Sequence, residues 1–261
     1  MTSRLRSRAA VSAVAALAVL ALAACSGGGD DSADPSPSSS ATTSDEPAGD
    51  DLTQEEFVST VTAAMVESGS VHVVLNLGAG GAAGEGDIAV GQTPQDSAIS
   101  MTVNGNEVLL VDGSYYVNLA QASGGMYLEV DPDGTGQFAS TFGPVLEQAA
   151  PVSQLRLFES ALVGFAVGEG TQEVDGVTTT PYVLTVDPAK VLSAAQVALV
   201  EGALPPTMDV TLYLGPDDLP RRVVSTIAGA DLTIEYSAWG EPVDIEAPPA
   251  DLVTDGAPFG L

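Results

Sequence analysis

The stretch that decides the fold is residues 208–236, which read MDVTLYLGPDDLPRRVVSTIAGADLTIEY. Apolar residues alternate with other residues from Met208 to Leu214, and they do so again from Leu232 to Tyr236. A period of two is typical of a β-strand that buries one face. The turn-forming residues 215–218 follow the first of these runs and precede a third strand candidate at 221–224. The stretch therefore predicts neighbouring antiparallel strands joined by tight turns.

The same alternation recurs upstream in the chain. The runs from Val71 to Leu77, from Ile99 to Val103 and from Met126 to Val130 each place apolar residues on one strand face. Asn104-Gly105 and Asp112-Gly113 are dipeptides typical of β-hairpin turns, because both residues tolerate a positive φ. We therefore expect one antiparallel sheet built from hairpins.

Helical spacing appears in three places. Residues 52–65 repeat apolar side chains every three to four positions, and Thr53 with Glu56 forms a capping box at their start. Residues 138–163 and 188–203 contain two further apolar stretches that we expect to be helical, each with a broad apolar face. A broad face needs contacts on two sides, which either a solid core or an internal cavity could supply. Helices and an antiparallel sheet in one domain predict the α+β class.

The N-terminus has the features of a bacterial signal peptide. Arg4, Arg6 and Arg8 give a positive segment, and the 13 residues from Ala9 to Ala21 are apolar. A span of this length is well short of the roughly 20 residues that cross a bilayer. The run Leu22-Ala23-Ala24-Cys25 then resembles the lipobox of bacterial lipoproteins. We therefore expect residues 1–24 to be removed.

The lipobox resemblance implies that Cys25 becomes the first residue and carries acyl chains, such as palmitate. Two chains anchor a protein stably, whereas one binds a membrane only marginally. We therefore expect a lipid-anchored protein on the extracytoplasmic face of the cell membrane. Residues 26–51 contain almost only small, acidic or turn-forming residues, so residues 25–51 are predicted to be a disordered tether. As a random coil the tether spans roughly 25–30 Å.

The charge of the chain excludes one class of partner. After residue 24 only four basic residues remain, against all 35 acidic ones. Such a chain repels the phosphate backbone, so nucleic-acid binding is not expected. Cys25 is the sole cysteine, and its modification leaves no thiol for a disulfide, a zinc site or a nucleophile.

Catalytic and cofactor motifs are weak throughout. His72 is the one histidine and lies on a predicted strand face opposite Val71 and Val73, where a solvent-facing role is expected. Residues 78–86 lack the spacing of a dinucleotide fingerprint and are predicted to be a hairpin loop. Residues 131–136 resemble the start of a calcium loop, but Phe142 stands where the bidentate Glu belongs. We therefore expect no catalytic residue, no metal site, no cofactor and no enzymatic activity.

Several segments occur in the order found in a known family. They are the strand start Ser70-Val71-His72-Val73, the turn at 111–116, the step Val174-Asp175-Gly176-Val177, and the closing runs 239–243 and 247–249. Together with the lipobox they make the chain resemble the LppX/LprAFG family of actinobacterial envelope lipoproteins, which has a LolA-like lipid-carrier fold. The most specific piece is Trp-Gly-x-Pro-Val at 239–243.

The resemblance covers residues 52–250 and leaves 251–261 as a tail. It implies a curved antiparallel half-barrel whose helices cover the concave face around an apolar cavity. In that family the cavity takes acyl chains of lipids or lipoglycans, so the chain is expected to carry such a ligand within the cell envelope. An export transporter is a further candidate partner.

The match to the family's second sheet strand implies that Ile99 faces the cavity, with Met101 and Val103 on the same side. A place in a solid core is the alternative for these residues. The alternative for the whole protein is a protein-interaction module with a filled core, and a hydrolase is a more distant one. The candidate ligand-binding residues are Val73, Leu75, Ile99, Met101, Val103, Phe142, Leu146, Leu162 and Leu192.

Overall fold

The structure of the protein is a computed structural model that describes residues 51–78, 81, 83–130, 150–191, 204–227 and 229–254. These residues belong to the compact unit formed by 45–261. The expected signal peptide, Cys25 and the tether up to residue 50 lie outside the described residues. Within the described ranges, no helix combines the length and the apolar character needed to span a bilayer.

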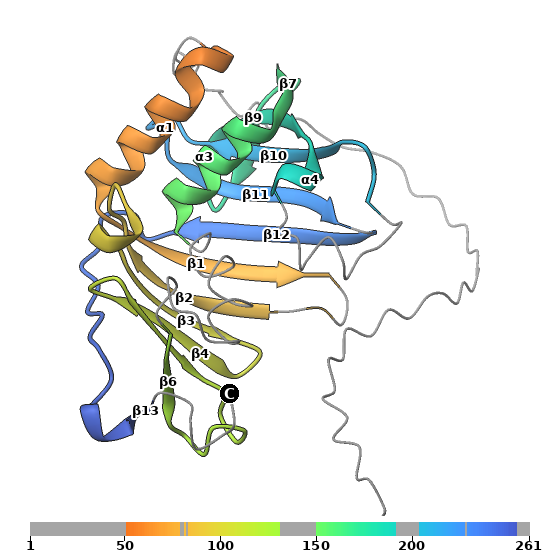
Figure 1. Cartoon of the computed structure of the whole chain (residues 1–261). Helices are drawn as coiled ribbons and strands as arrows, with labels where there is room; N and C mark the ends of the chain where they lie inside the picture. Colours follow the sequence, from red (N-terminus) through yellow and green to blue (C-terminus); the bar gives the residue numbers. More distant parts are fainter. Residues whose placement is uncertain are drawn as a thin grey trace, which may run out of the picture. The chain divides into compact units, whose positions relative to one another are not determined.

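One large sheet dominates the described part of the chain (Figure 1). Its strands follow the order β13-β6-β5-β4-β3-β2-β1-β12-β11-β10-β9-β7, and β8 pairs with β9. The strands are β1 Ser70–Leu77, β2 Ala83–Ala89, β3 Ala98–Val103, β4 Asn106–Val111, β5 Ser114–Asn118, β6 Tyr127–Val130, β7 Leu162–Val167, β8 Gln172–Val174, β9 Val177–Val186, β10 Met208–Leu214, β11 Pro220–Ile227, β12 Ala230–Ser237 and β13 Val253–Thr254. The helices are α1 Gln54–Ser68, α3 Pro151–Ala161 and α4 Pro188–Val191, with short 3-10 turns at Pro94–Asp96 and Ala250–Leu252.

Every described strand pair is antiparallel except β13 with β6. Figure 1 shows the strand direction turning strongly between β12 and β6, so the sheet is curved. The helices α1, α3 and α4 lie over the part of the sheet made by β9 to β12 (Figure 1). The predicted α+β class and the curved antiparallel sheet are confirmed.

The predicted hairpin turns are present. Asn104-Gly105 joins β3 to β4, and Asp112-Gly113 joins β4 to β5. In both turns the two central residues have positive φ, between 51° and 80°. This is the backbone of a type I′ turn, whose twist matches that of the flanking strands. Local turn chemistry therefore fixes this half of the sheet.

Helix α1 begins where its capping box predicts. The Thr53 backbone N–H donates to Glu56 Oε2 over 3.3 Å, and the Thr53 hydroxyl donates to the same oxygen over 2.6 Å. These hydrogen bonds lower the pKa of Glu56. The helix ends at Gly69, whose φ of 81° suits a residue without a Cβ. Its buried face consists of Phe57, Val61 and Met65.

The glycine-rich segment 78–86 differs from the predicted loop. Strand β2 begins at Ala83, so Gly84 and Gly86 are strand residues that pair with β1 and β3. A Cβ on Gly84 would lie 2.8 Å from the Thr102 carbonyl oxygen, and one on Gly86 would lie 2.6 Å from Met101 Cα. These contacts are too close for any side chain. The two glycines therefore allow β2 and β3 to approach at a bend of the sheet.

The second predicted helix is also shorter than expected. Helix α3 ends at Ala161, and Leu162 and Val163 belong to strand β7. The register with β9 shifts between Leu162 and Gly164, which leaves Val163 as a bulge with 57% of its surface exposed. A β-branched residue followed by glycine favours a strand over a helix. The expected helical residues 138–149 and 192–203 lie outside the described residues.

Candidate ligand cavity

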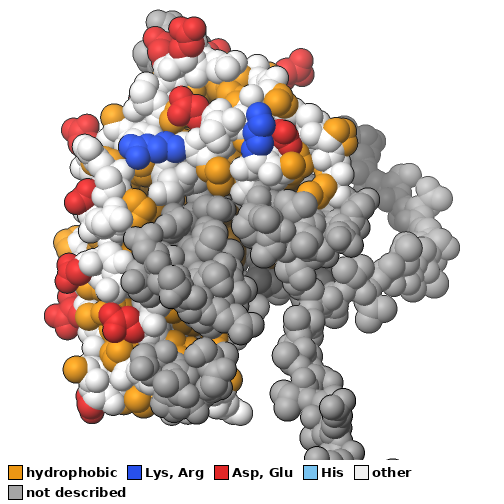
Figure 2. Space-filling model, in the orientation of Figure 1, with side chains coloured by type: hydrophobic (Ala, Val, Ile, Leu, Met, Phe, Trp, Pro, Cys, Tyr) orange, Lys and Arg blue, Asp and Glu red, His pale blue; other side chains and the backbone are white. Residues whose placement is uncertain are grey.

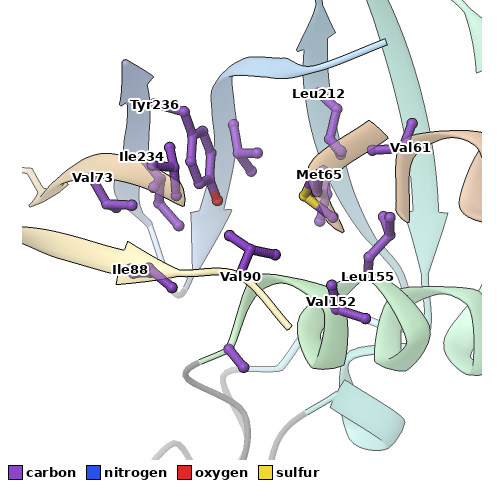
Figure 3. Close-up of a cluster of buried hydrophobic side chains, with 14 of the residues drawn as sticks. Val61, Met65, Val73, Ile88, Val90, Val152, Leu155, Leu212, Ile234 and Tyr236 are labelled. Atoms are coloured by element: carbon purple, nitrogen blue, oxygen red, sulfur yellow. The ribbon is translucent and has the colours of Figure 1, made fainter. Parts of the chain in front are cut away.

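A cavity of about 160 Å³ lies between the helices and the C-terminal strands of the sheet. Helix α1 and helix α3 line one side, with Val191 of α4, and strands β10, β11 and β12 line the other. Figure 3 shows Val61, Met65 and Leu155 on the helices and Leu212, Ile234 and Tyr236 on the strands around this region. The described lining residues are Val61, Met65, Pro151, Gln154, Leu155, Leu157, Phe158, Val191, Met208, Val210, Leu212, Pro220, Val223, Ser225, Leu232, Ile234 and Tyr236.

The alternation noted in the sequence supplies the strand wall. On β10 the residues Met208, Val210 and Leu212 are buried and line the cavity, whereas Asp209 between them is exposed. Successive side chains of a strand point to opposite faces, so one face of β10 is apolar and the other meets solvent. Strand β12 repeats the arrangement with Leu232, Ile234 and Tyr236.

Strand pairing extends this face across the sheet. Leu212 lies opposite Val223, Val223 opposite Ile234, and Ile234 opposite Leu75. Directly opposed residues in an antiparallel sheet share one face. The cavity wall on β10 to β12 and the predicted residues on β1 therefore lie on the same side of the sheet.

The lining is almost entirely apolar. Among the described lining residues, only Gln154, Ser225 and Tyr236 carry a polar side-chain group, and none is charged. Figure 2 shows acidic side chains at several places on the described surface of one face, interspersed with hydrophobic side chains. The charge of the chain is therefore kept out of the cavity wall. Such a wall suits an uncharged, apolar ligand segment.

Tyr236 is the largest of the polar lining residues. Its ring stacks on Trp239 with the centroids 6.0 Å apart and the planes 22° apart. The Trp239 Nε1–H donates to the Pro220 carbonyl oxygen over 2.9 Å, which fixes the indole. Burial raises the pKa of the Tyr236 phenol well above its ordinary value, so the phenol is neutral at physiological pH.

His72 lies away from the cavity. Its side chain points to the other face of the sheet from that of Val73. Its Nδ1 is 2.7 Å from Asp87 Oδ1 on the neighbouring strand β2. The sequence predicted an outward-facing histidine but not this carboxylate, which is 15 positions away along the chain. Among the described residues there is no group of three potential metal ligands. The described cavity lining contains no histidine, cysteine or carboxylate that could act as a base or nucleophile.

The predicted ligand residues that the structure describes are buried or half-buried but do not line this cavity. Val73 and Ile99 belong to the buried core, and Leu75, Met101 and Leu162 pack against it. Val103 is half-buried at the end of β3. Their role in binding stays a prediction. Phe142, Leu146 and Leu192 lie outside the described residues.

Residues of β10, β11, β12 and α1 line the cavity although the sequence did not single them out as ligand-binding. The alternation of β10 and β12 showed which residues share a face. The sequence carries no local signal for which face the helices cover, because that depends on contacts between distant segments.

Comparisons with known proteins give structural neighbours only. No family model matches the sequence, and no curated protein matches it. Among solved structures, LprF from Mycobacterium bovis is 19% identical, with a TM-score of 0.48 over 75% of this chain and 96% of its own. The lipoprotein LppX from Mycobacterium tuberculosis is 15% identical, with a TM-score of 0.44 over 74% of this chain and 100% of its own. The names LprF and LppX both occur in the name of the family that the sequence resembles.

Proposed function

We propose that this protein is an envelope lipoprotein that binds an acyl chain of a lipid or lipoglycan in the cavity and carries it within the cell envelope. The observation that carries the proposal is the apolar space between the helices and β10 to β12. An acyl chain needs dry walls and no reactive group, and the lining has this composition. Each methylene that leaves water for such a wall contributes about 0.8 kcal/mol.

The size of the cavity sets the scale of the ligand segment. An apolar cavity of about 150 Å³ stays dry and binds a molecule as large as benzene. The cavity here, at about 160 Å³, therefore accommodates a segment of one alkyl chain. A carrier of this kind needs neither a metal nor a catalytic group.

The proposed anchor and tether give the cavity access to its ligand. Cys25 with two acyl chains holds the protein at the outer face of the cell membrane. A tether of 26 residues lets the domain move roughly 25–30 Å from that attachment. The domain can thus reach lipids at the surface and a receiving partner, such as an export transporter, within the envelope.

Organic extraction followed by mass spectrometry tests the proposal directly. The material is the protein with Cys25→Ala, exported in its native host behind a cleavable signal peptide and purified without detergent. We expect a co-purified lipid in a defined ratio to protein. A domain that carries no lipid and takes up no acyl probe would instead support the protein-interaction module with a filled core.

A pair of tryptophan variants places the ligand. Val223 is 6% exposed and lines the cavity, whereas the adjacent Val224 is half-buried on the other face of β11. Val223→Trp should fill the cavity and abolish saturable uptake of a fluorescent fatty acid. Val224→Trp is the matched control and should leave uptake unchanged. Equal uptake by both variants would place the ligand elsewhere.

A further inference from the structure

The hydroxyl group of Tyr236 is an unusual feature of the apolar cavity. The side chain is only 7% exposed and is part of the lining. Figure 3 shows its oxygen at the end of the ring that points toward Val90. The phenol oxygen is thus one of two polar side-chain atoms that the described strands contribute to the lining, the other being the hydroxyl oxygen of Ser225.

Within the described part of the chain, no hydrogen bond links Tyr236 Oη to another residue. Other tyrosines of the sheet do have such bonds. Tyr182 Oη accepts a hydrogen bond from the Leu52 N–H over 3.0 Å, and Tyr127 Oη donates to Glu107 over 2.7 Å. Buried hydroxyl groups nearly always have a partner, because water has been removed from them. Tyr236 Oη is not one of the fully enclosed polar atoms without a partner, which are Thr62 Oγ1 and Arg221 Nε among the described residues. A molecule in the cavity, either water or a ligand, can therefore supply the partner of Tyr236 Oη.

The position of this hydroxyl is fixed before a ligand binds. Stacking on Trp239 and the hydrogen bond from Trp239 to Pro220 hold the ring plane. The ring cannot turn its oxygen to solvent without breaking that stack. Of the other polar lining residues, Gln154 is half-buried on a helix, and Ser225 has a short side chain opposite Leu232, four residues before Tyr236 on β12. Tyr236 is the donor that is both buried and rigid.

We infer that the ligand segment in the cavity bears an oxygen function, a hydroxyl, keto or ester carbonyl oxygen, that accepts a hydrogen bond from Tyr236 Oη. The inference rests on the proposed function and narrows it to oxygenated acyl lipids. A plain alkyl chain would fill the space but leave the phenol unpaired. An oxygenated chain binds more tightly than a plain alkyl chain because it accepts the hydrogen bond that the phenol otherwise lacks.

Direct binding of defined probes tests the inference. The protein is the chain of residues 25–261 with Cys25→Ala, and the probes are stearic acid and a set of hydroxystearic acids that differ in hydroxyl position. Each competes with a fluorescent fatty acid. We expect at least one isomer to bind roughly three- to tenfold more tightly than stearic acid, as one net hydrogen bond allows.

Tyr236→Phe removes only the hydroxyl and keeps the ring on Trp239. It should abolish the preference for the isomer while stearic acid binds as before. Tyr182→Phe is the matched control, because Tyr182 is bonded to Leu52 and does not line the cavity. That variant should keep the preference. Thermal unfolding of the ligand-free Tyr236→Phe protein should be unchanged or occur at a higher temperature.

The outcomes separate the two proposals. If stearic acid and every isomer bind equally, or if the preference survives in Tyr236→Phe, the inference is wrong and the lipid-carrier proposal stands. A lower unfolding temperature for ligand-free Tyr236→Phe would also overturn it, because the hydroxyl would then have a partner without ligand. If no probe binds at all, both proposals fail together.

Discussion

Val73 on β1 lies directly opposite Tyr236 on β12, and on its other side it lies opposite Gly86 on β2. The residue therefore joins two halves of one sheet that come from opposite ends of the domain. On one side of Val73 is the cavity wall, and on the other are the glycine strand and the predicted ligand residues of β3. Strands β2 to β6 lie on one side of β1, and strands β12 to β9 lie on the other. The pairing of β1 with β12 therefore joins the apolar faces of the two groups of strands into one continuous inner face.

The bend at β2 gives the first prediction. Gly86→Val should lower the free energy of unfolding by about 3 kcal/mol or more, because its Cβ has no space beside Met101. Glu85→Val is the matched control, since Glu85 is exposed and points to the other face. It should change stability by less than about 0.5 kcal/mol. Chemical denaturation measures the free energy of unfolding of both variants. A loss for Gly86→Val as small as that for Glu85→Val would show that β2 and β3 can move apart at little cost.

The elements that the sequence predicted are those with local signals. Alternation from Met208 to Leu214 and the dipeptides at 104–105 and 112–113 act within a few residues, so strand faces and hairpin turns were correct. Segment 78–86 was predicted as a loop because glycine favours loops. In the structure Gly84 and Gly86 are required by the approach of another strand, which is a tertiary cause.

The boundary between α3 and β7 shows a second limit. Leu155, Phe158 and Leu162 recur at helical spacing, so the predicted helix continues to Val163. In the structure Leu162 instead pairs with Val186 of β9, so the helix ends at Ala161 and strand β7 begins. A cavity was expected, but the residues that line it were not singled out, for a related reason. Which face of β10 to β12 is covered depends on α1 and α3, and the sequence holds no local mark of that contact.

The start of α1 gives the second prediction. Thr53→Ala removes one half of the capping box and should lower stability by about 1 kcal/mol at neutral pH. The hydrogen bonds from Thr53 lower the pKa of Glu56, so the carboxylate contributes stability above its unfolded-state pKa. That contribution is lost as the pH falls through the lowered pKa. The difference between wild type and variant should therefore shrink in acid, as thermal unfolding at several pH values would show. A stability difference between wild type and Thr53→Ala that does not change with pH would contradict the role of the Glu56 carboxylate in the capping box.

Anchoring gives the third prediction, and it concerns the expected lipobox. Cys25→Ala should give protein that is either released from the membrane or retained with an uncleaved signal peptide. The reason is that the acylated thioether is the proposed attachment. Fractionation and the mass of the N-terminal peptide measure this. Cleaved protein that stays tightly bound would require a different anchor, and Ser26→Ala serves as the neighbouring control.

The tether gives the fourth prediction. Deletion of residues 30–48 should leave thermal unfolding unchanged, since these residues include no large apolar side chain that could be buried. It should also shorten the reach of the domain, which lipid transfer between two membranes held at a set distance would detect. Replacement of the same residues by a Gly/Ser segment of equal length controls for composition. A drop of several degrees in the unfolding temperature would show that the segment packs on the domain.

The fifth prediction distinguishes packed core from ligand space on the inner face. Ile99 is 1% exposed and lies between Ile88 and Leu110, which are themselves buried. Ile99→Trp should therefore overpack the core and lower stability by about 1–3 kcal/mol or more. Val223→Trp enters the cavity and should cost less than that. Ser100→Trp, on the other face of β3, is the control for the ring itself.

Two measurements on the same variants decide the matter: thermal unfolding and uptake of a fluorescent fatty acid. For Ile99→Trp we expect a lowered unfolding temperature, with weaker uptake only in proportion to the unfolded fraction. For Val223→Trp we expect the reverse, a near-normal unfolding temperature and no uptake. Normal unfolding with lost uptake in Ile99→Trp would instead place the acyl chain against β3. The ligand would then follow the inner face past Val73 and Gly86, and the sequence-based assignment of Ile99 would be the correct one.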